Sequence, residues 1–174
     1  MTDIKTIVFL ATAFAGTTAV AQESDPGGMM AAQGCMMVTD AGSADVTFDG
    51  ETQSAGAAYK PGPNGEAFVV LGVLDGQTPV WCLTILTAVP VDGQTIDVAA
   101  PETVLQTEDG AMVVMARPAA GDDQGSYFRA SEGTVSFEAG ETLQGQINVS
   151  GVLETADGQA DASITGSFSA VALD

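Results

Sequence analysis

The stretch that decides the fold covers residues 143–173 and reads LQGQINVSGVLETADGQADASITGSFSAVAL. Asp157 and Gly158 lie at its centre, and Asp-Gly is a strong signal for a two-residue hairpin turn, because both positions of that turn need positive φ. The turn predicts these cross-strand pairs: Leu153 with Ala162, Gly151 with Ile164, Val149 with Gly166, Ile147 with Phe168, Gly145 with Ala170, and Leu143 with Ala172. All of them share one apolar face, so the sequence predicts a long β-hairpin packed on one side.

The opposite face of this hairpin is almost wholly polar. Its residues are Gln144, Gln146, Asn148, Ser150, Glu154, Asp161, Ser163, Thr165, Ser167 and Ser169. A register slip of one residue would move the apolar set into water, so the alternation itself specifies which residues face inward. No charges converge on the polar face, and we interpret it as scaffold.

Further turn signals divide the preceding sequence. Asp-Gly recurs at residues 49–50, 75–76, 92–93 and 109–110, and Asn64-Gly65 adds another. Regularly spaced turns between β-branched and aromatic runs indicate an antiparallel all-β domain. No run of ten or more residues after the N-terminal region shows a helical period.

Two more hairpins are predicted from these turns. The turn at 75–76 pairs Leu71 with Val80 and makes both faces apolar, which predicts two central core strands at residues 68–74 and 80–86. The turn at 109–110 sets Leu105 against Val114 and Val104 against Met115.

The region before the long hairpin predicts two strands. Residues 127–130 form a short edge strand, and residues 133–138 alternate with Val135 and Phe137 on one face. A three-residue loop at 139–141 pairs Val135 with Gly145, and a five-residue loop is the alternative.

A resemblance covers the last part of the chain. Residues 133–170 contain a Gly-Thr-Val-Ser-Phe strand, a Gly-Gln-Ile-Asn-Val strand, an Asp-Gly turn and an Ile-Thr-Gly-Ser-Phe strand. This pattern resembles the closing strands of bacterial exported β-sandwich proteins, and no functional residue is implied by it. The predicted fold is an antiparallel β-sandwich of about eight to ten strands built from consecutive hairpins, with a small closed β-barrel as the alternative. An outer-membrane barrel is disfavoured because aromatic residues are too few for two girdles.

The N-terminal residues have the layout of a secretory signal peptide. Lys5 precedes an apolar run at 7–15, and Ala19-Val20-Ala21 supplies a small-residue cleavage site, so we expect cleavage after Ala21. The run is shorter than the ~20 residues that span a bilayer. Residues 22–45 are predicted to be a flexible segment partly tied by a disulfide, and residues 46–174 a single β domain. The expected location is the periplasm or the exterior of a bacterium.

The charge balance limits the partners. The chain has 23 acidic and 4 basic residues and a net charge of −19, which excludes nucleic acid as a partner and disfavours anionic lipid. No other run predicts a membrane span. Cys35 and Cys82 are the only cysteines, and in an exported chain this even count predicts a disulfide.

Little in the sequence indicates catalysis. Histidine is absent, which removes the commonest general base and metal ligand. Lys60 would have to be buried to act with a serine nucleophile. The remaining enzyme hypothesis is acid–base work by carboxylates alone, for which no pair can be singled out. We therefore predict a protein without enzymatic activity and without a cofactor.

Two metal hypotheses remain open. A methionine-rich segment with one cysteine offers soft ligands for copper, and several acidic turns offer oxygen ligands for calcium. The soft set is Met29, Met30, Cys35, Met36 and Met37; the acidic set is Asp49, Glu51, Glu108, Asp109, Asp122 and Asp123. Neither set has the spacing of a known site, so no metal is predicted.

One cluster has the composition of a partner contact. Tyr127 and Arg129 follow the acidic pair Asp122 and Asp123, and Tyr and Arg are favoured at interfaces. The predicted function is an exported, non-enzymatic β domain that binds a protein or another cell-envelope component, or serves structurally. The alternatives are an inhibitor of a cationic hydrolase such as a lysozyme, a carboxylate enzyme and a soft-metal carrier.

Overall fold

The computed structural model describes residues 35–107, 109–118 and 125–173. The expected signal peptide, Met29, Met30, Glu108, Asp122 and Asp123 lie outside these residues. The elements are β1 Ser43–Phe48, β2 Glu51–Pro61, β3 Ala67–Asp75, β4 Thr78–Thr87, β5 Thr95–Asp97, α2 Pro101–Thr107, β6 Ala111–Arg117, β7 Ser126–Glu138, β8 Leu143–Thr155 and β9 Gly158–Ala172. The first strand begins three residues before the predicted domain boundary at residue 46.

The strands close into a ring. Each main strand pairs antiparallel with the next along the chain, with β4 followed by β6, and β9 returns to pair with β1. Eight strands therefore form a closed antiparallel barrel, and the short β5 adds to the edge of β7 beyond the end of β6. The all-β antiparallel class is confirmed, and the architecture is the barrel alternative. Closure also removes the open edges that a sandwich would have to protect.

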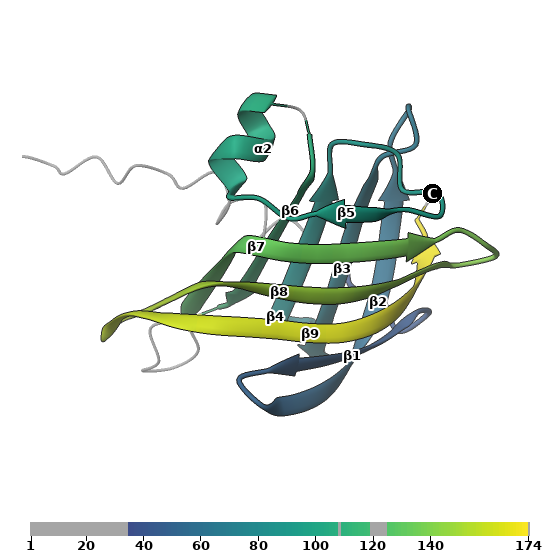
Figure 1. The fold of residues 1–174 in the computed structure, drawn as a ribbon. Coiled ribbons are helices and arrows are strands. Elements are labelled where there is room, and N and C mark those ends of the chain that lie inside the picture. The colour runs from purple at the N-terminus through teal and green to yellow at the C-terminus, as the bar shows by residue number, and fades with distance from the viewer. Residues whose placement is uncertain (1–34, 108, 119–124, 174) are drawn as a thin grey trace, which may run out of the picture.

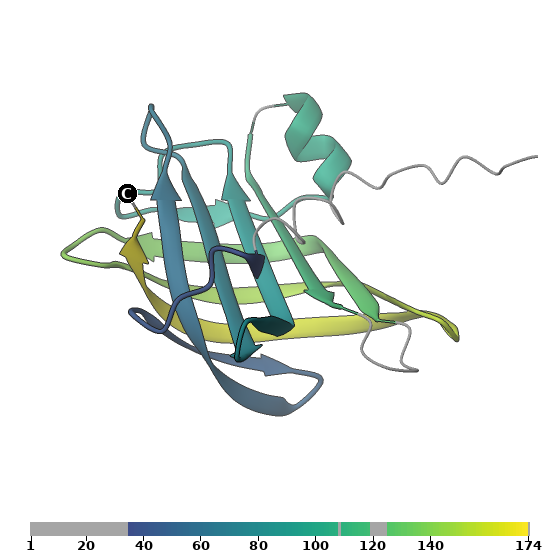
Figure 2. The same ribbon diagram turned by 180° about the vertical axis from the view of Figure 1, so that it is seen from behind.

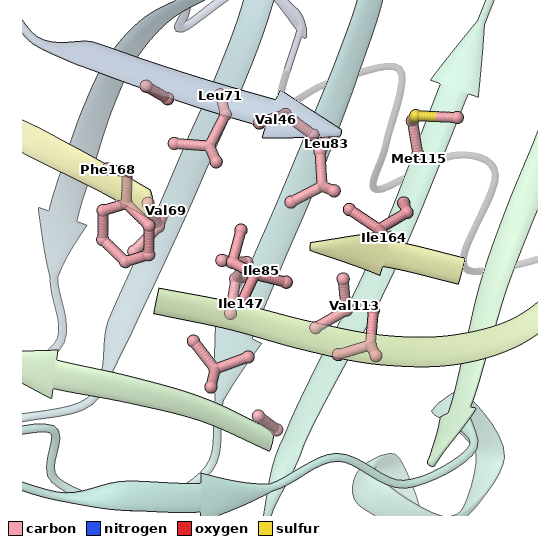
Figure 3. Close-up of a cluster of buried hydrophobic side chains, with 14 of the residues drawn as sticks. Val46, Val69, Leu71, Leu83, Ile85, Val113, Met115, Ile147, Ile164 and Phe168 are labelled. Carbon is pink, nitrogen blue, oxygen red and sulfur yellow. The ribbon is translucent and has the colours of Figure 1, made fainter. Parts of the chain in front are cut away.

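The barrel is flattened into two walls (Figure 1). The front wall consists of β7, β8 and β9, and its strands run across those of the back wall, which consists of β2, β3, β4 and β6. Apolar side chains from both walls point toward one another and fill the space between them, as Figure 3 shows for Val69, Leu71, Leu83, Ile85, Val113, Ile147, Ile164 and Phe168. The interior is thus the hydrophobic core, as expected for a barrel of eight strands.

The β8–β9 hairpin has the predicted faces but a different register. Gly151 pairs with Ala162 and Val149 pairs with Ile164, a shift of two residues from the predicted pairs. Because the shift is even, the inward set is unchanged and the faces are confirmed by burial. Glycine also stands opposite a large side chain, at Gly145 opposite Phe168.

The turn explains the shift. Thr155 pairs with Gly158, so the turn residues are Ala156 and Asp157, and neither of them has positive φ. Gly158 takes the positive φ, +132°, as the first residue of β9. The expected turn with positive φ at both positions occurs instead at Asp49 and Gly50, with φ of 52° and 85°.

The β3–β4 hairpin also differs from the predicted register. Leu71 pairs with Leu83, and the turn residues are Gly76 and Gln77 with a bulge after Val73. The two strands are central and buried, as predicted. Both of their faces are apolar, so alternation gave no constraint on the register.

The predicted hairpin at 109–110 is wrong. Residues Pro101–Thr107 form the short helix α2, and β6 pairs with β4. Proline suits the first turn of a helix, and Val104 of α2 packs on Met112 and Val114 outside the back wall. Seven residues are too few for a helical period to be recognised in the sequence.

The strand before the long hairpin is longer than predicted. The expected edge strand at 127–130 is part of the thirteen-residue β7, which pairs with β6 and β8. Phe137 pairs with Gly145, so the connection is the five-residue alternative rather than the three-residue loop.

The segment before β1 crosses the outside of the back wall, and we call residues 35–42 the N-terminal strap (Figure 2). A disulfide joins Cys35 to Cys82 of β4, with the Cα atoms 5.4 Å apart, as predicted. Three glycines leave room for the strap: a Cβ at Gly42, Gly56 or Gly72 would overlap neighbouring backbone or side-chain atoms. Within the described residues, no helix is long and apolar enough to cross a bilayer.

Candidate functional site

The predicted contact residues are held by the barrel itself. Tyr127 packs against the Val104 cluster beneath α2. The Arg129 guanidinium lies 2.5 Å from a carboxylate oxygen of Glu154 and 3.5 Å from one of Glu102, and 30% of its side chain is exposed. These contacts connect α2 to β7 and β8. Phe128, which lies between Tyr127 and Arg129 in the sequence, is fully buried in the core. Asp122 and Asp123 lie outside the described residues.

The residues proposed for other chemistry are dispersed. Lys60 is exposed on β2. The Cys35 sulfur is in the disulfide, Met37 packs beside it, and Met36 points into solvent with 82% of its surface exposed. Among residues 35–107, 109–118 and 125–173, no three His, Cys, Asp or Glu side chains lie close enough to hold a metal ion.

Among the acidic residues that the structure describes, one carboxyl has a resolved pKa shift, and it lies in the loop between β2 and β3. Hydrogen bonds from the side chain and the backbone N–H of Asn64 hold the Glu66 pKa below its ordinary value. A lowered pKa favours the carboxylate, which is the opposite of what a general acid needs. We therefore assign Glu66 a structural role in the loop between β2 and β3, where it accepts hydrogen bonds from Asn64.

The barrel interior leaves no room for a sizeable ligand at the end near the β1–β2 turn. There Phe48, Trp81 and Arg117 border a hollow of about 10 Å³, about the space of one water molecule. Arg117 lies over the Phe48 ring, 5.0 Å from its centroid, and the Trp81 indole N–H donates to Gln53 at 2.5 Å. This hollow is therefore too small for a ligand larger than water.

The outer face of the front wall continues over β1 and onto the first half of β2. Strand registers align its outward residues into rows that cross the strands. We call the set the hydroxyl–amide face: Thr134, Ser136, Gln144, Gln146, Asn148, Ser150, Ser163, Thr165, Ser167, Ser169, Ser43, Thr47, Thr52 and Ser54. Asp45, Asp97, Glu132 and Glu138 are the acidic residues among these rows. In Figure 1 the strands β7, β8 and β9, which carry most of this face, lie in front.

Hollows follow this face from one side of the barrel to the other. A groove of about 550 Å³ lies over β7, β8, β9, β1 and β2. A second of about 510 Å³ shares Ser136 and Gln146 with it, and a third of about 550 Å³ beside α2 shares Thr95 of β5 with the second. Together they trace one extended path across the strands.

The polar groups on this path are open to a ligand. Within the described residues, the side chains of Ser136, Gln146 and Ser167 make no hydrogen bond to another protein group. Some neighbours are paired, since Ser54 donates to Asp45 at 2.7 Å and the hydroxyls of Thr47 and Thr52 lie 2.7 Å apart. The hollow thus presents both hydrogen-bond donors and acceptors, most of them on uncharged side chains.

Sequence reasoning found most of this face and interpreted its β8–β9 part as scaffold. Alternation identified the outward residues of β8 and β9, and those of the end of β7. The contribution of β1 and β2 depends on the pairing of β1 with β9, for example Thr47 with Thr165, which joins the two ends of the chain. The continuation of these rows from β9 onto β1 and β2 is a property of the closed barrel.

No protein-family model, curated protein or solved structure matches the chain. Its function is therefore inferred from the geometry of the hydroxyl–amide face.

Proposed function

We propose that the protein is an exported, non-enzymatic β-barrel of the bacterial cell envelope that binds an envelope component through the hydroxyl–amide face. The observation that carries this proposal is the face itself: an open, hollowed surface of mostly hydroxyl and amide side chains on a chain with a net charge of −19. The outer face of the back wall differs, because α2 and the N-terminal strap pack on it.

Export is supported by the N-terminal residues and by the disulfide. Residues 1–21 have the order of a signal peptide, and disulfides persist in oxidising compartments. The resemblance of residues 133–170 to exported proteins agrees with this location. Mass spectrometry of protein from the envelope or culture fluid should find Gln22 as the first residue; a full-length chain in the cytoplasm would contradict export.

Cross-linking in the producing cell tests the binding surface. A photoreactive diazirine amino acid at Ser167 would lie on the exposed side of β9, within the groove. The matched control places it at Val80, which is 49% exposed on β4 of the back wall. We expect an envelope adduct from position 167 and none from position 80. Equal labelling from the two positions, or none from 167, would refute the proposed surface.

A further inference from the structure

One row of the hydroxyl–amide face crosses six strands. It runs from Ser54 of β2 through Asp45, Ser167, Gln146 and Ser136 to Thr95 of β5, each residue directly paired with the next. Neighbouring strands lie about 4.8 Å apart, so the row is about 24 Å long. The three hollows follow the same row, which gives the path the length of a chain-like ligand rather than of a single small molecule.

Charge selects the class of that ligand. The net charge of −19 repels anionic polymers and also disfavours a second copy of the same chain. A cationic partner would be held by carboxylates. Asp45, the single carboxylate in the row, already accepts a hydrogen bond from Ser54, and Glu138 and Asp97 line the hollows beside the row. An uncharged ligand is not repelled by this charge and can be held by the hydroxyl and amide groups that dominate the row.

Hydrogen-bonding groups narrow the class further. Ser136, Gln146 and Ser167 offer hydroxyl and amide groups that both donate and accept, at a spacing set by the strands. A sugar ring with its glycosidic bond has a similar length, so successive sugars would each meet a polar group from a new strand. The outward residues of these rows include no aromatic side chain, so recognition rests on hydrogen bonds rather than on ring stacking.

We propose that this row binds an uncharged, extended polysaccharide, laid across the strands from β2 to β5. The inference rests on the proposed function, because it names the class of envelope component that the hydroxyl–amide face recognises. The polymer lies outside the barrel, and the apolar interior takes no part in binding. Each sugar contributes a few hydrogen bonds, so affinity grows with the number of sugars that the row can contact.

Binding is tested with the full exported chain and defined polymers. The probes are mixed-linkage β-glucan, amylose and mannan as neutral chains, and alginate as an anionic one, measured by calorimetry and by retardation in gels that contain the polymer. We expect binding to at least one neutral chain, weaker binding to its short oligosaccharides, none to alginate, and no weakening in high salt, which screens only charges. Failure of all three neutral polymers to bind overturns the inference.

Variants locate the site. Replacing Ser136 and Gln146 together by alanine removes two hydrogen-bonding side chains and should weaken binding about tenfold or more. Ser167→Ile blocks the groove with a side chain that suits a strand. Gln159→Ala is the control, because this exposed glutamine lies in the β8–β9 turn region outside the row. Unchanged circular dichroism verifies folding, and equal binding by the face variants and the control would refute the site.

The two proposals fail separately. If position 167 cross-links to an envelope protein while no neutral polymer binds, the proposed surface stands and the polysaccharide inference is wrong. If neither cross-linking nor polymer binding involves the face, both are wrong.

Discussion

Removing the disulfide should destabilise the barrel by about 4 kcal/mol. The perturbation is the double replacement of Cys35 and Cys82 by alanine. The bridge spans 47 residues of sequence, and the loop-closure entropy it removes from the unfolded chain corresponds to about 4 kcal/mol for a loop of that length. A domain of this size has a free energy of unfolding of about 5–15 kcal/mol, so the loss is a large share of the total.

The assay is urea unfolding followed by the fluorescence of Trp81, the single tryptophan, which is 3% exposed in the core. With a slope of about 1–3 kcal/mol per molar urea, the midpoint should fall by about 1–4 M. Reduced wild-type protein should behave like the variant. Met36→Ser is the control, since this neighbour of Cys35 is exposed and its replacement should leave the midpoint unchanged. A loss below about 1 kcal/mol would refute the loop-entropy reasoning.

Three further predictions concern the core, one glycine and one carboxyl. Phe168→Asp buries an unpaired charge, so it should cost more than about 5 kcal/mol of folding free energy and abolish folding. Ser167→Asp, on the exposed face beside it, should cost less than about 1 kcal/mol. Circular dichroism and solubility compare the two variants, and a folded Phe168→Asp with an unfolded Ser167→Asp would mean that the faces are reversed. Gly151→Ala places a Cβ against the backbone of β7 and should cost about 1–3 kcal/mol in urea unfolding, whereas Gly140→Ala should stay within about 0.5 kcal/mol. The pKa of Glu66 is lowered in the folded state, so its contribution to stability is present above pH 4.5 and is lost as the pH falls through the folded-state pKa. The free energy of unfolding should therefore fall less for Glu66→Gln than for wild type between pH 5 and pH 3. Urea unfolding at each pH measures it, and superimposable plots of unfolding free energy against pH would contradict the prediction.

Alternation was informative wherever one face of a strand meets the core. It placed Ile147 and Phe168 inside and Ser167 outside, and all three are so placed in the barrel. The Asp-Gly dipeptides predicted the geometry of the turns less well than alternation predicted the faces. At the β8–β9 turn a single glycine takes the positive φ, so the register shifted by two residues without exchanging the faces. Turn geometry depends on φ values that a dipeptide does not fix.

Other features depend on long-range contacts. The β3–β4 register was open because both faces are apolar, and the helix α2 is stabilised by Val104 packing on the back wall rather than by its own seven residues. Closure joins residues such as Val46 and Gly166, between which the sequence shows no local relation. The continuation of the hydroxyl–amide face onto β1 and β2 follows from that closure and could not be predicted from the sequence.

The pairing of β1 with β9 also determines the order in which the fold can be completed. A chain that emerges N-terminus first presents Ser43–Phe48 long before Gly158–Ala172 is available to cover it. Cys35 and Cys82 are both available by mid-chain, so oxidation can fix the strap while the first strand still has an unpaired side. Contacts of such high sequence separation slow folding, and a chaperone that covers nascent β1 until β9 arrives would act on the most aggregation-prone intermediate.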